Sequence, residues 1–214
     1  MKNLLVILAL CCTLTPLHAQ DNDALWKSAL AQLDAARKWA AAEVEIVSDI
    51  EKGGARQHVV TTMRLRGWEK GRPVYELVRR EPEDKNASAH DFDSVAGLLD
   101  VAEKLSESRP VRTDGQSLDG MPCALFEVRQ DGALQKGTVK LWVDAGSGTL
   151  RQMVVAMRAP FVLDATVTVR YSAGPEGNPL PHTLDYVLET LVPFKHGKGR
   201  AKQSNRTWIA RPAA

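Results

Sequence analysis

The sequence predicts an α+β domain in which helices pack on one face of an antiparallel sheet. Apolar residues recur at helical spacing in two segments, residues 23–42 and 91–105. Elsewhere, short runs that alternate between apolar and polar residues are separated by glycine-containing turns. The expected order along the chain is therefore helix, three strands, helix, and then five or six strands.

The first predicted helix is amphipathic and begins at Asp23. Aspartate is a favoured helix cap because its carboxylate accepts hydrogen bonds from the first free backbone N–H groups. Asp34 and Lys38 lie four residues apart on the polar face, where they form a favourable pair. The other face must be buried, and it consists of Trp26, Ala29, Leu30, Leu33, Ala36 and Ala40.

Three strands linked by hairpins are predicted to follow this helix. Alternating runs at residues 44–50 and 59–65 flank a Gly-Gly turn, which is typical of a hairpin. A third run, around Tyr75 and Leu77, follows a turn at residues 69–73. Three consecutive strands joined in this way form a meander.

The second helix is predicted to interrupt the sheet before the remaining strands. Asp91 is a suitable cap, and apolar residues from Val95 to Leu105 follow it at helical spacing. Turn residues recur beyond Pro110, and closely spaced strands without intervening helices are typical of an antiparallel sheet. The alternating runs between these turns are residues 124–129, 138–144, 150–157, 165–172 and 183–191.

The amino-terminal residues have the layout of a secretory signal peptide. Lys2 precedes an apolar run at residues 4–10, and Ala19 is a small residue suited to cleavage. The run is too short to cross a membrane, which takes about 20 mostly apolar residues. We therefore expect residues 1–19 to be removed and residues 20–214 to form one exported domain.

Charge and cysteine content restrict the partners and the redox chemistry. The net charge is only +2, so no global field attracts nucleic acid. Cys11 and Cys12 fall within the signal peptide, which leaves Cys123 as the single cysteine of the mature domain and predicts no internal disulfide. Because Cys123 lies in an apolar run, burial is favoured over a reactive role. A lipid anchor on Cys12 is the disfavoured alternative to cleavage after Ala19.

The sequence contains no recognisable catalytic apparatus. Neither a nucleophile elbow of the G-x-S-x-G type nor a phosphate-binding glycine loop is present. His90, Asp91 and Asp93 form the closest acid and imidazole grouping, but a metal site needs more ligands, so helix capping is favoured. We expect no enzyme activity, no cofactor, no metal and no nucleic-acid partner.

A basic segment at residues 195–211 carries six lysines or arginines and no acidic residue. Lysines on an exposed edge strand protect a sheet against aggregation, and this interpretation is favoured. Contact with anionic lipid headgroups is the alternative.

Four stretches of the sequence resemble the LolA-like superfamily of periplasmic lipoprotein-sorting proteins. They are residues 137–144 (GTVKLWVD), 150–155 (LRQMVV), 167–171 (VTVRY) and 177–181 (GNPLP). The resemblance implies an incompletely closed antiparallel β half-barrel, covered by two or more helices, with an apolar cavity for acyl chains. It also implies a periplasmic carrier whose partners are lipid or lipoprotein acyl chains, together with a membrane donor or acceptor protein.

Large and soft apolar residues on the predicted strands are the candidates for lining such a cavity. Methionine and aromatic side chains adapt to irregular apolar guests, although the same residues also fill an ordinary core. A protein-binding envelope regulator or sensor, built on the same half-barrel, is the alternative function. The candidate residues are Met63, Leu65, Tyr75, Leu77, Trp142, Met153, Val155, Val167, Val169, Tyr171 and Tyr186.

Overall fold

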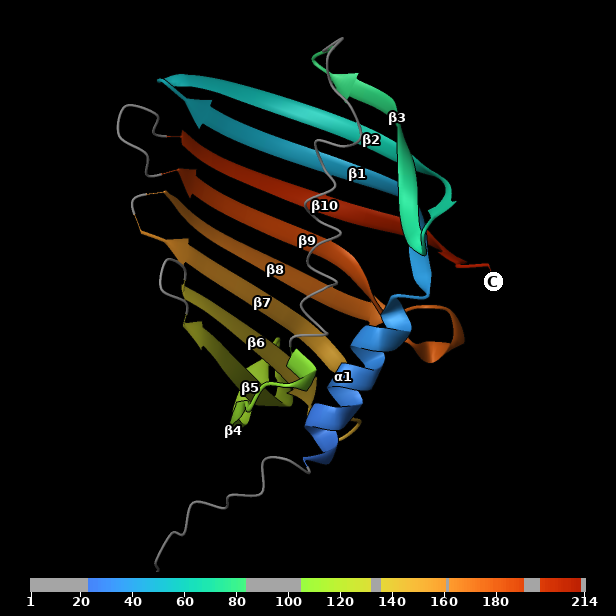
Figure 1. Ribbon diagram of the computed structural model, residues 1–214, viewed down its shortest axis with the longest axis vertical. Coiled ribbons are helices and arrows are strands. Elements are labelled where there is room, and N and C mark those ends of the chain that lie inside the picture. Colours follow the sequence, from blue (N-terminus) through green and yellow to red (C-terminus); the bar gives the residue numbers. More distant parts are fainter. Residues whose placement is uncertain (1–22, 84–104, 132–135, 161, 191–196, 213–214) are drawn as a thin grey trace, which may run out of the picture.

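The computed structural model describes residues 23–83, 105–131, 136–160, 162–190 and 197–212. Within these ranges the protein has one α-helix and a single ten-stranded antiparallel sheet, shown in Figure 1. The helix, α1, runs from Ala24 to Ala36, and a short 3-10 turn, η3, covers Pro175–Gly177. The strands are β1 (Trp39–Lys52), β2 (Ala55–Glu69), β3 (Arg72–Glu81), β4 (Val111–Leu118), β5 (Met121–Asp131), β6 (Lys136–Asp144), β7 (Leu150–Ala159), β8 (Leu163–Ala173), β9 (Pro179–Thr190) and β10 (Gly197–Ala210).

The last strand joins the two halves of the sheet. The spatial order is β3-β2-β1-β10-β9-β8-β7-β6-β5-β4, so β10 lies between β1 and β9. Its pairing with β1 extends from Trp39 opposite Ala210 to Lys52 opposite Gly197. The edges of the sheet are therefore β3 and β4.

The basic segment thus lies on an interior strand, and the expectation of an edge strand was wrong. Its cations meet acidic residues on both neighbouring strands. Lys198 Nζ lies 3.1 Å from Glu189 Oε1 on β9, and Arg206 Nη2 lies 3.6 Å from Glu45 Oε1 on β1. Opposite charges on neighbouring strands attract, whether they lie directly opposite, as Lys198 and Glu189 do, or diagonally, so this basic sequence fits an interior position.

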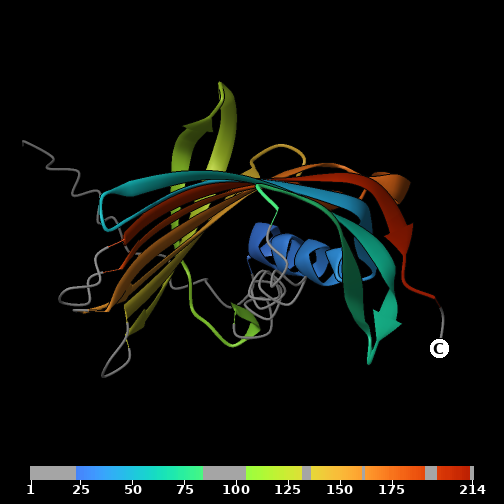
Figure 2. The ribbon, with the colours of Figure 1, turned by 90° about the horizontal axis from the view of Figure 1, so that it is seen from above.

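The sheet is strongly curved, and α1 lies on its concave side, as Figure 2 shows. Helix residues Trp26, Ala29 and Leu33 are buried there in one cluster with side chains from β5 to β9. Alternation along each strand turns every second side chain toward this helix. The core therefore lies on the concave side.

The expected half-barrel covered by two or more helices was wrong, because strands dominate the described chain and the sheet is open. Residues 39–42, predicted as helix, belong to β1. Small apolar residues fit either periodicity, and pairing with β10 decides in favour of the strand. Residues 91–104 of the second predicted helix lie outside the described residues, whereas Leu105 is fully buried in the core.

Asp23 caps α1 as predicted. Its Oδ1 accepts hydrogen bonds from the backbone N–H groups of Leu25, at 3.0 Å, and Trp26, at 3.3 Å. Its Oδ2 lies 2.7 Å from Arg112 Nη1 on β4, so one carboxylate both caps the start of the helix and ties it to an edge strand.

We expect Asp23→Ala to lower the free energy of unfolding by about 1 to 2 kcal/mol, because a cap and an ion pair are lost together. Asp23→Asn should retain most of the capping contribution. Urea unfolding measures both variants, with Asp34→Ala on the outer face of the same helix as control. Equal destabilisation by Asp23→Ala and Asp34→Ala would contradict the capping role.

Asp144 organises the turn between β6 and β7. Its Oδ1 accepts hydrogen bonds from the backbone N–H of Ser147 at 2.8 Å and of Gly146 at 3.1 Å, and Arg151 Nη2 donates to Oδ2 at 2.9 Å. These interactions, the Ser147 hydrogen bond first, lower the pKa of Asp144 from 3.8 to about 2. Burial of the carboxyl opposes them only in part.

A lowered folded-state pKa contributes stability that is present above the unfolded pKa and is lost as the pH falls through the folded value. We therefore expect Asp144→Asn to be less stable than the unmodified protein at pH 7. The difference should shrink between about pH 4 and pH 2. Thermal unfolding across this range tests the expectation, with Asp119→Asn in another turn as control, and a difference independent of pH would contradict it.

Candidate functional site

One face of the sheet is built from rows of side chains that cross almost all of its strands. Side chains directly opposite each other on paired strands lie on the same face, so the register defines these rows. One such row, here called the central row, is buried along its whole length. It consists of Thr61, Ile46, Gln203, Leu184, Val169, Met153, Leu141 and Phe126, in order from β2 to β5.

The structure brings ten of the eleven predicted lining residues to this concave face. Nine of them belong to or pack against two apolar clusters, and Leu65 is half-buried opposite Tyr75. Those on the concave face are Met63, Leu65, Tyr75, Leu77, Met153, Val155, Val167, Val169, Tyr171 and Tyr186.

Trp142 does not share this face. It lies between Leu141 and Val143, which point to the concave side, and it pairs with Leu125 and Gln152 on the convex side. The sequence could not decide this parity because apolar residues occupy three successive positions of β6.

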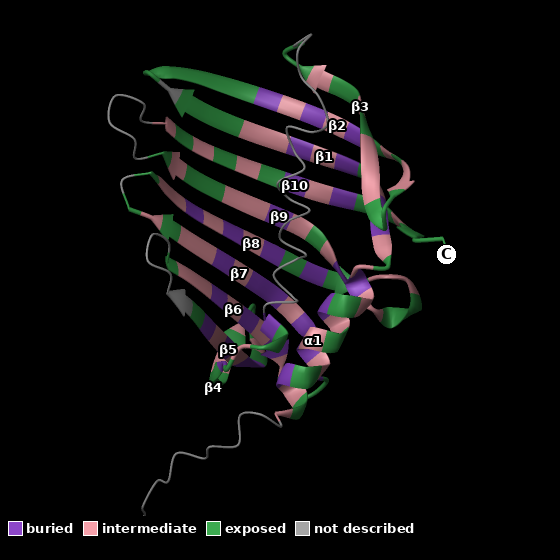
Figure 3. Cartoon of the chain, in the orientation of Figure 1, coloured by how far each residue is buried: buried purple, intermediate pink, exposed green. Residues whose placement is uncertain are grey.

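The first apolar cluster is covered by α1. The rings of Trp26 and Phe126 have their centroids 5.5 Å apart. Gln32 fixes the helix to the β6–β7 turn, because its Nε2 donates to the Gly148 carbonyl at 2.7 Å and its Oε1 accepts from the Leu150 N–H at 2.8 Å. Figure 3 shows buried residues, in purple, along the strands on which this helix packs.

The second apolar cluster lies on the other half of the sheet. It contains Ala41, Val44, Ile46 and Met63, with Tyr75, Leu77, Ala201 and Trp208 packed against it. These side chains come from β1, β2, β3 and β10. Within the described ranges no residue of α1 belongs to it.

A polar chain separates the two clusters. Tyr186 donates its hydroxyl hydrogen to Gln203 Oε1 at 3.1 Å, Gln203 Nε2 donates to Asn205 Oδ1 at 2.8 Å, and Asn205 Nδ2 donates to the Pro181 carbonyl at 2.6 Å. Gln203 and Asn205 were not predicted to lie on this face, because most of their neighbours in β10 are polar as well. They satisfy one another inside an otherwise apolar face.

The tyrosines of the concave face stay neutral over the physiological range. Burial raises the pKa of Tyr75 to about 12, and it also raises the pKa of Tyr171 and Tyr186. The cause is the loss of hydration of a phenolate in apolar surroundings. The face therefore presents no negative charge from these hydroxyls.

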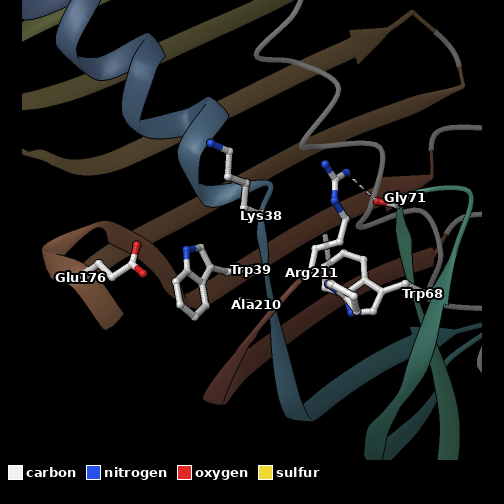
Figure 4. Close-up of a pocket in the computed structure, with 8 residues that line it drawn as sticks. Lys38, Trp39, Trp68, Gly71, Glu176, Ala210 and Arg211 are labelled. Carbon is white, nitrogen blue, oxygen red and sulfur yellow. Dashed lines mark hydrogen bonds between the residues drawn. The ribbon is translucent and has the colours of Figure 1, made fainter. Parts of the chain in front are cut away.

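A pocket of about 780 Å³ lies where four distant segments meet. They are the α1–β1 junction, the β2–β3 turn, η3 and the end of β10. Figure 4 shows its side chains. The lining residues are Lys38, Trp39, Trp68, Gly71, Glu176, Ala210, Arg211 and Pro212.

The remaining chemistry is sparse. No group of three or more metal-ligating side chains occurs in the described part of the chain, and no helix there is long and apolar enough to cross a membrane. Residues 90–93 lie outside the described residues. Cys123 is 1% exposed, as predicted, and its pKa is raised by burial and by the nearby charge of Asp144.

Comparison with known proteins leaves the family open. No family model matches the chain, and no curated protein sequence matches it. Among solved structures, the chain is similar to a DUF1329 family protein from Desulfovibrio piger, with 11% identity and a TM-score of 0.45. The likeness covers 89% of this chain and 93% of that one.

Proposed function

We propose that this chain is an exported carrier, related to the LolA-like proteins, that binds acyl chains of lipids or lipoproteins on the concave face of its sheet. The observation that carries the proposal is the extent of one apolar face, which runs from β3 to β5. Acyl chains need a long, weakly specific apolar surface, and methionine and aromatic side chains suit irregular guests.

The two clusters have different roles in this proposal. The cluster beneath α1 is a packed core, because the helix fills its concave side with Trp26, Ala29 and Leu33. The second cluster extends the same face beyond the described helix, and we assign the acyl chains to its half-buried members Tyr75, Leu77 and Trp208. The polar chain through Gln203 marks the boundary between the two.

The test introduces a glutamate into each cluster, because a charge in a binding surface weakens ligand binding whereas a charge in a packed core lowers stability. Leu77→Glu, at the second cluster, should leave the protein folded and weaken binding of a fluorescent fatty acid by at least about tenfold. Met153→Glu, beneath α1, should chiefly lower the melting temperature. Trp142→Glu, on the convex face, is the matched control and should retain binding.

Native mass spectrometry of protein purified gently from a bacterial periplasm completes the test. We expect lipid adducts that disappear on denaturation, on a chain that begins at Gln20. An unmodified protein without adducts that also fails to bind fatty acids would exclude the carrier function. Leu77→Glu that binds as tightly as the unmodified protein would exclude the assigned surface.

A further inference from the structure

The pocket lined by Trp39 and Trp68 has a charge composition that the acyl-binding proposal does not use. Its walls carry two cations, Lys38 and Arg211, one carboxylate, Glu176, and two indole rings. A pocket of about 780 Å³ is within the size range of small-molecule sites, which is roughly 300 to 1,000 Å³. Figure 4 shows Glu176 beside Trp39 on one side, Arg211 beside Trp68 on the other, and Lys38 between them.

Arg211 holds two walls of this pocket together. Its backbone N–H donates to the Lys38 carbonyl at 2.7 Å, and its Nη1 donates to the Gly71 carbonyl at 3.4 Å. Gly71 has a φ of 78°, and a Cβ at this position would lie 3.2 Å from Arg211 Nη1. A glycine in the β2–β3 turn thus lets the guanidinium approach the backbone closely.

The three charged groups have no ion-pair partner among the described residues, so the pair of Lys38 with Asp34 predicted from the sequence does not form. Several cations elsewhere on the surface are paired, as Arg170 is with Asp185 and Lys140 with Glu127. Lys38, Glu176 and Arg211 are all exposed. Charges of both signs that stay unpaired around one pocket are suited to a ligand that itself carries both signs.

We propose that this pocket binds a zwitterionic phosphodiester headgroup that bears a primary ammonium. Lys38 and Arg211 would contact the phosphate oxygens, since both side chains are established phosphate ligands. Glu176 would pair with the ammonium, and an indole face stabilises the same cation.

The position of the pocket connects this headgroup site to the concave face. Its walls include the α1–β1 junction, directly after the helix that covers that face, and the β2–β3 turn, which joins the strands carrying Met63 and Leu77. The assignment of the headgroup to an acyl lipid rests on the proposed function. Binding of the headgroup itself does not, because it can be measured without acyl chains.

The test uses the full mature chain and glycerophosphoethanolamine, which carries the headgroup but no acyl chain. Indole N–H signals in the NMR spectrum report on each tryptophan, assigned with Trp39→Phe and Trp68→Phe. We expect the Trp39 and Trp68 signals to shift with an affinity in roughly the millimolar range. Trp142, on the convex face, is an internal control and should not move.

Charge-neutralising variants identify the two halves of the ligand. Arg211→Gln and Lys38→Gln should each weaken binding about threefold to fivefold, which is the usual contribution of an exposed ion pair. Glu176→Gln should weaken glycerophosphoethanolamine by a similar factor but leave inorganic phosphate unaffected or bound more tightly. Glu189→Gln and Arg200→Gln are matched controls elsewhere on the surface.

Two outcomes would overturn the proposal. If inorganic phosphate reproduces the shifts and Glu176→Gln does not weaken glycerophosphoethanolamine, the pocket is a simple anion site. If neither Trp39 nor Trp68 responds at about 10 mM ligand, the pocket does not take this headgroup. If the protein still binds fatty acids in either of these cases, the acyl-binding proposal stands. Failure of the headgroup proposal can therefore be distinguished from failure of the acyl-binding proposal.

Discussion

Phe126→Ala is expected to lower the free energy of unfolding by about 3 to 5 kcal/mol, the range for truncating a fully buried phenylalanine. Phe126 is 1% exposed and ends the central row. Its ring packs on Trp26 with centroids 5.5 Å apart, and the Arg112 guanidinium lies 5.8 Å from its centroid. Truncation leaves a cavity between the helix and the sheet.

Urea unfolding monitored by circular dichroism measures this loss. The matched control is Val111→Ala on β4, where the side chain is 62% exposed and the cost should stay within about 0.5 kcal/mol. A cost below about 1 kcal/mol for Phe126→Ala would mean that the helix is not anchored through this ring.

Gln203→Leu is expected to cost about 2 to 4 kcal/mol, because it leaves two polar groups unpaired in an apolar face. The Tyr186 hydroxyl loses its acceptor, and Asn205 Oδ1 loses its donor. Leucine has nearly the volume of glutamine, so a cavity contributes little to this expectation.

A double-mutant cycle separates lost hydrogen bonds from altered packing. Adding Tyr186→Phe to Gln203→Leu should recover about 1 kcal/mol, although Tyr186→Phe alone is destabilising. Additive effects of the two substitutions would contradict a hydrogen-bonded chain. Thermal unfolding of the four proteins provides the comparison.

Local signals in the sequence predicted much of the sheet and its helix. Asp23 was identified as a cap because its chemistry depends only on the next three residues. Alternation placed Val167 and Val169 on one face of β8, since Thr166, Thr168 and Arg170 occupy the positions between and beside them. Alternation along a strand is a local property, so it is readable without knowing the partner strand.

The features that the sequence did not predict depend on contacts between segments that are distant in the sequence. Strand β10 was expected at an edge because it is polar, and only its pairing with both β1 and β9 shows that it lies inside the sheet. The pocket around Trp39 and Trp68 gathers residues from four segments, so no spacing in the sequence indicates it. The face of Trp142 could not be predicted because both of its neighbours are apolar, and the pairing of β6 with β5 and β7 decides it.

The insertion of β10 between β1 and β9 also governs the order of folding. Synthesis proceeds from the amino terminus, so β1 to β3 and β4 to β9 are complete before the strand that joins them exists. Each part then has an additional exposed edge, at β1 and at β9, and unpaired edges are sites of aggregation. Pairing of β10 with β1 joins residues that are very far apart in the sequence, such as Trp39 and Ala210. Contacts of such high sequence separation slow folding. We therefore expect the refolding rate, more than the equilibrium stability, to depend on substitutions along the β1–β10 seam.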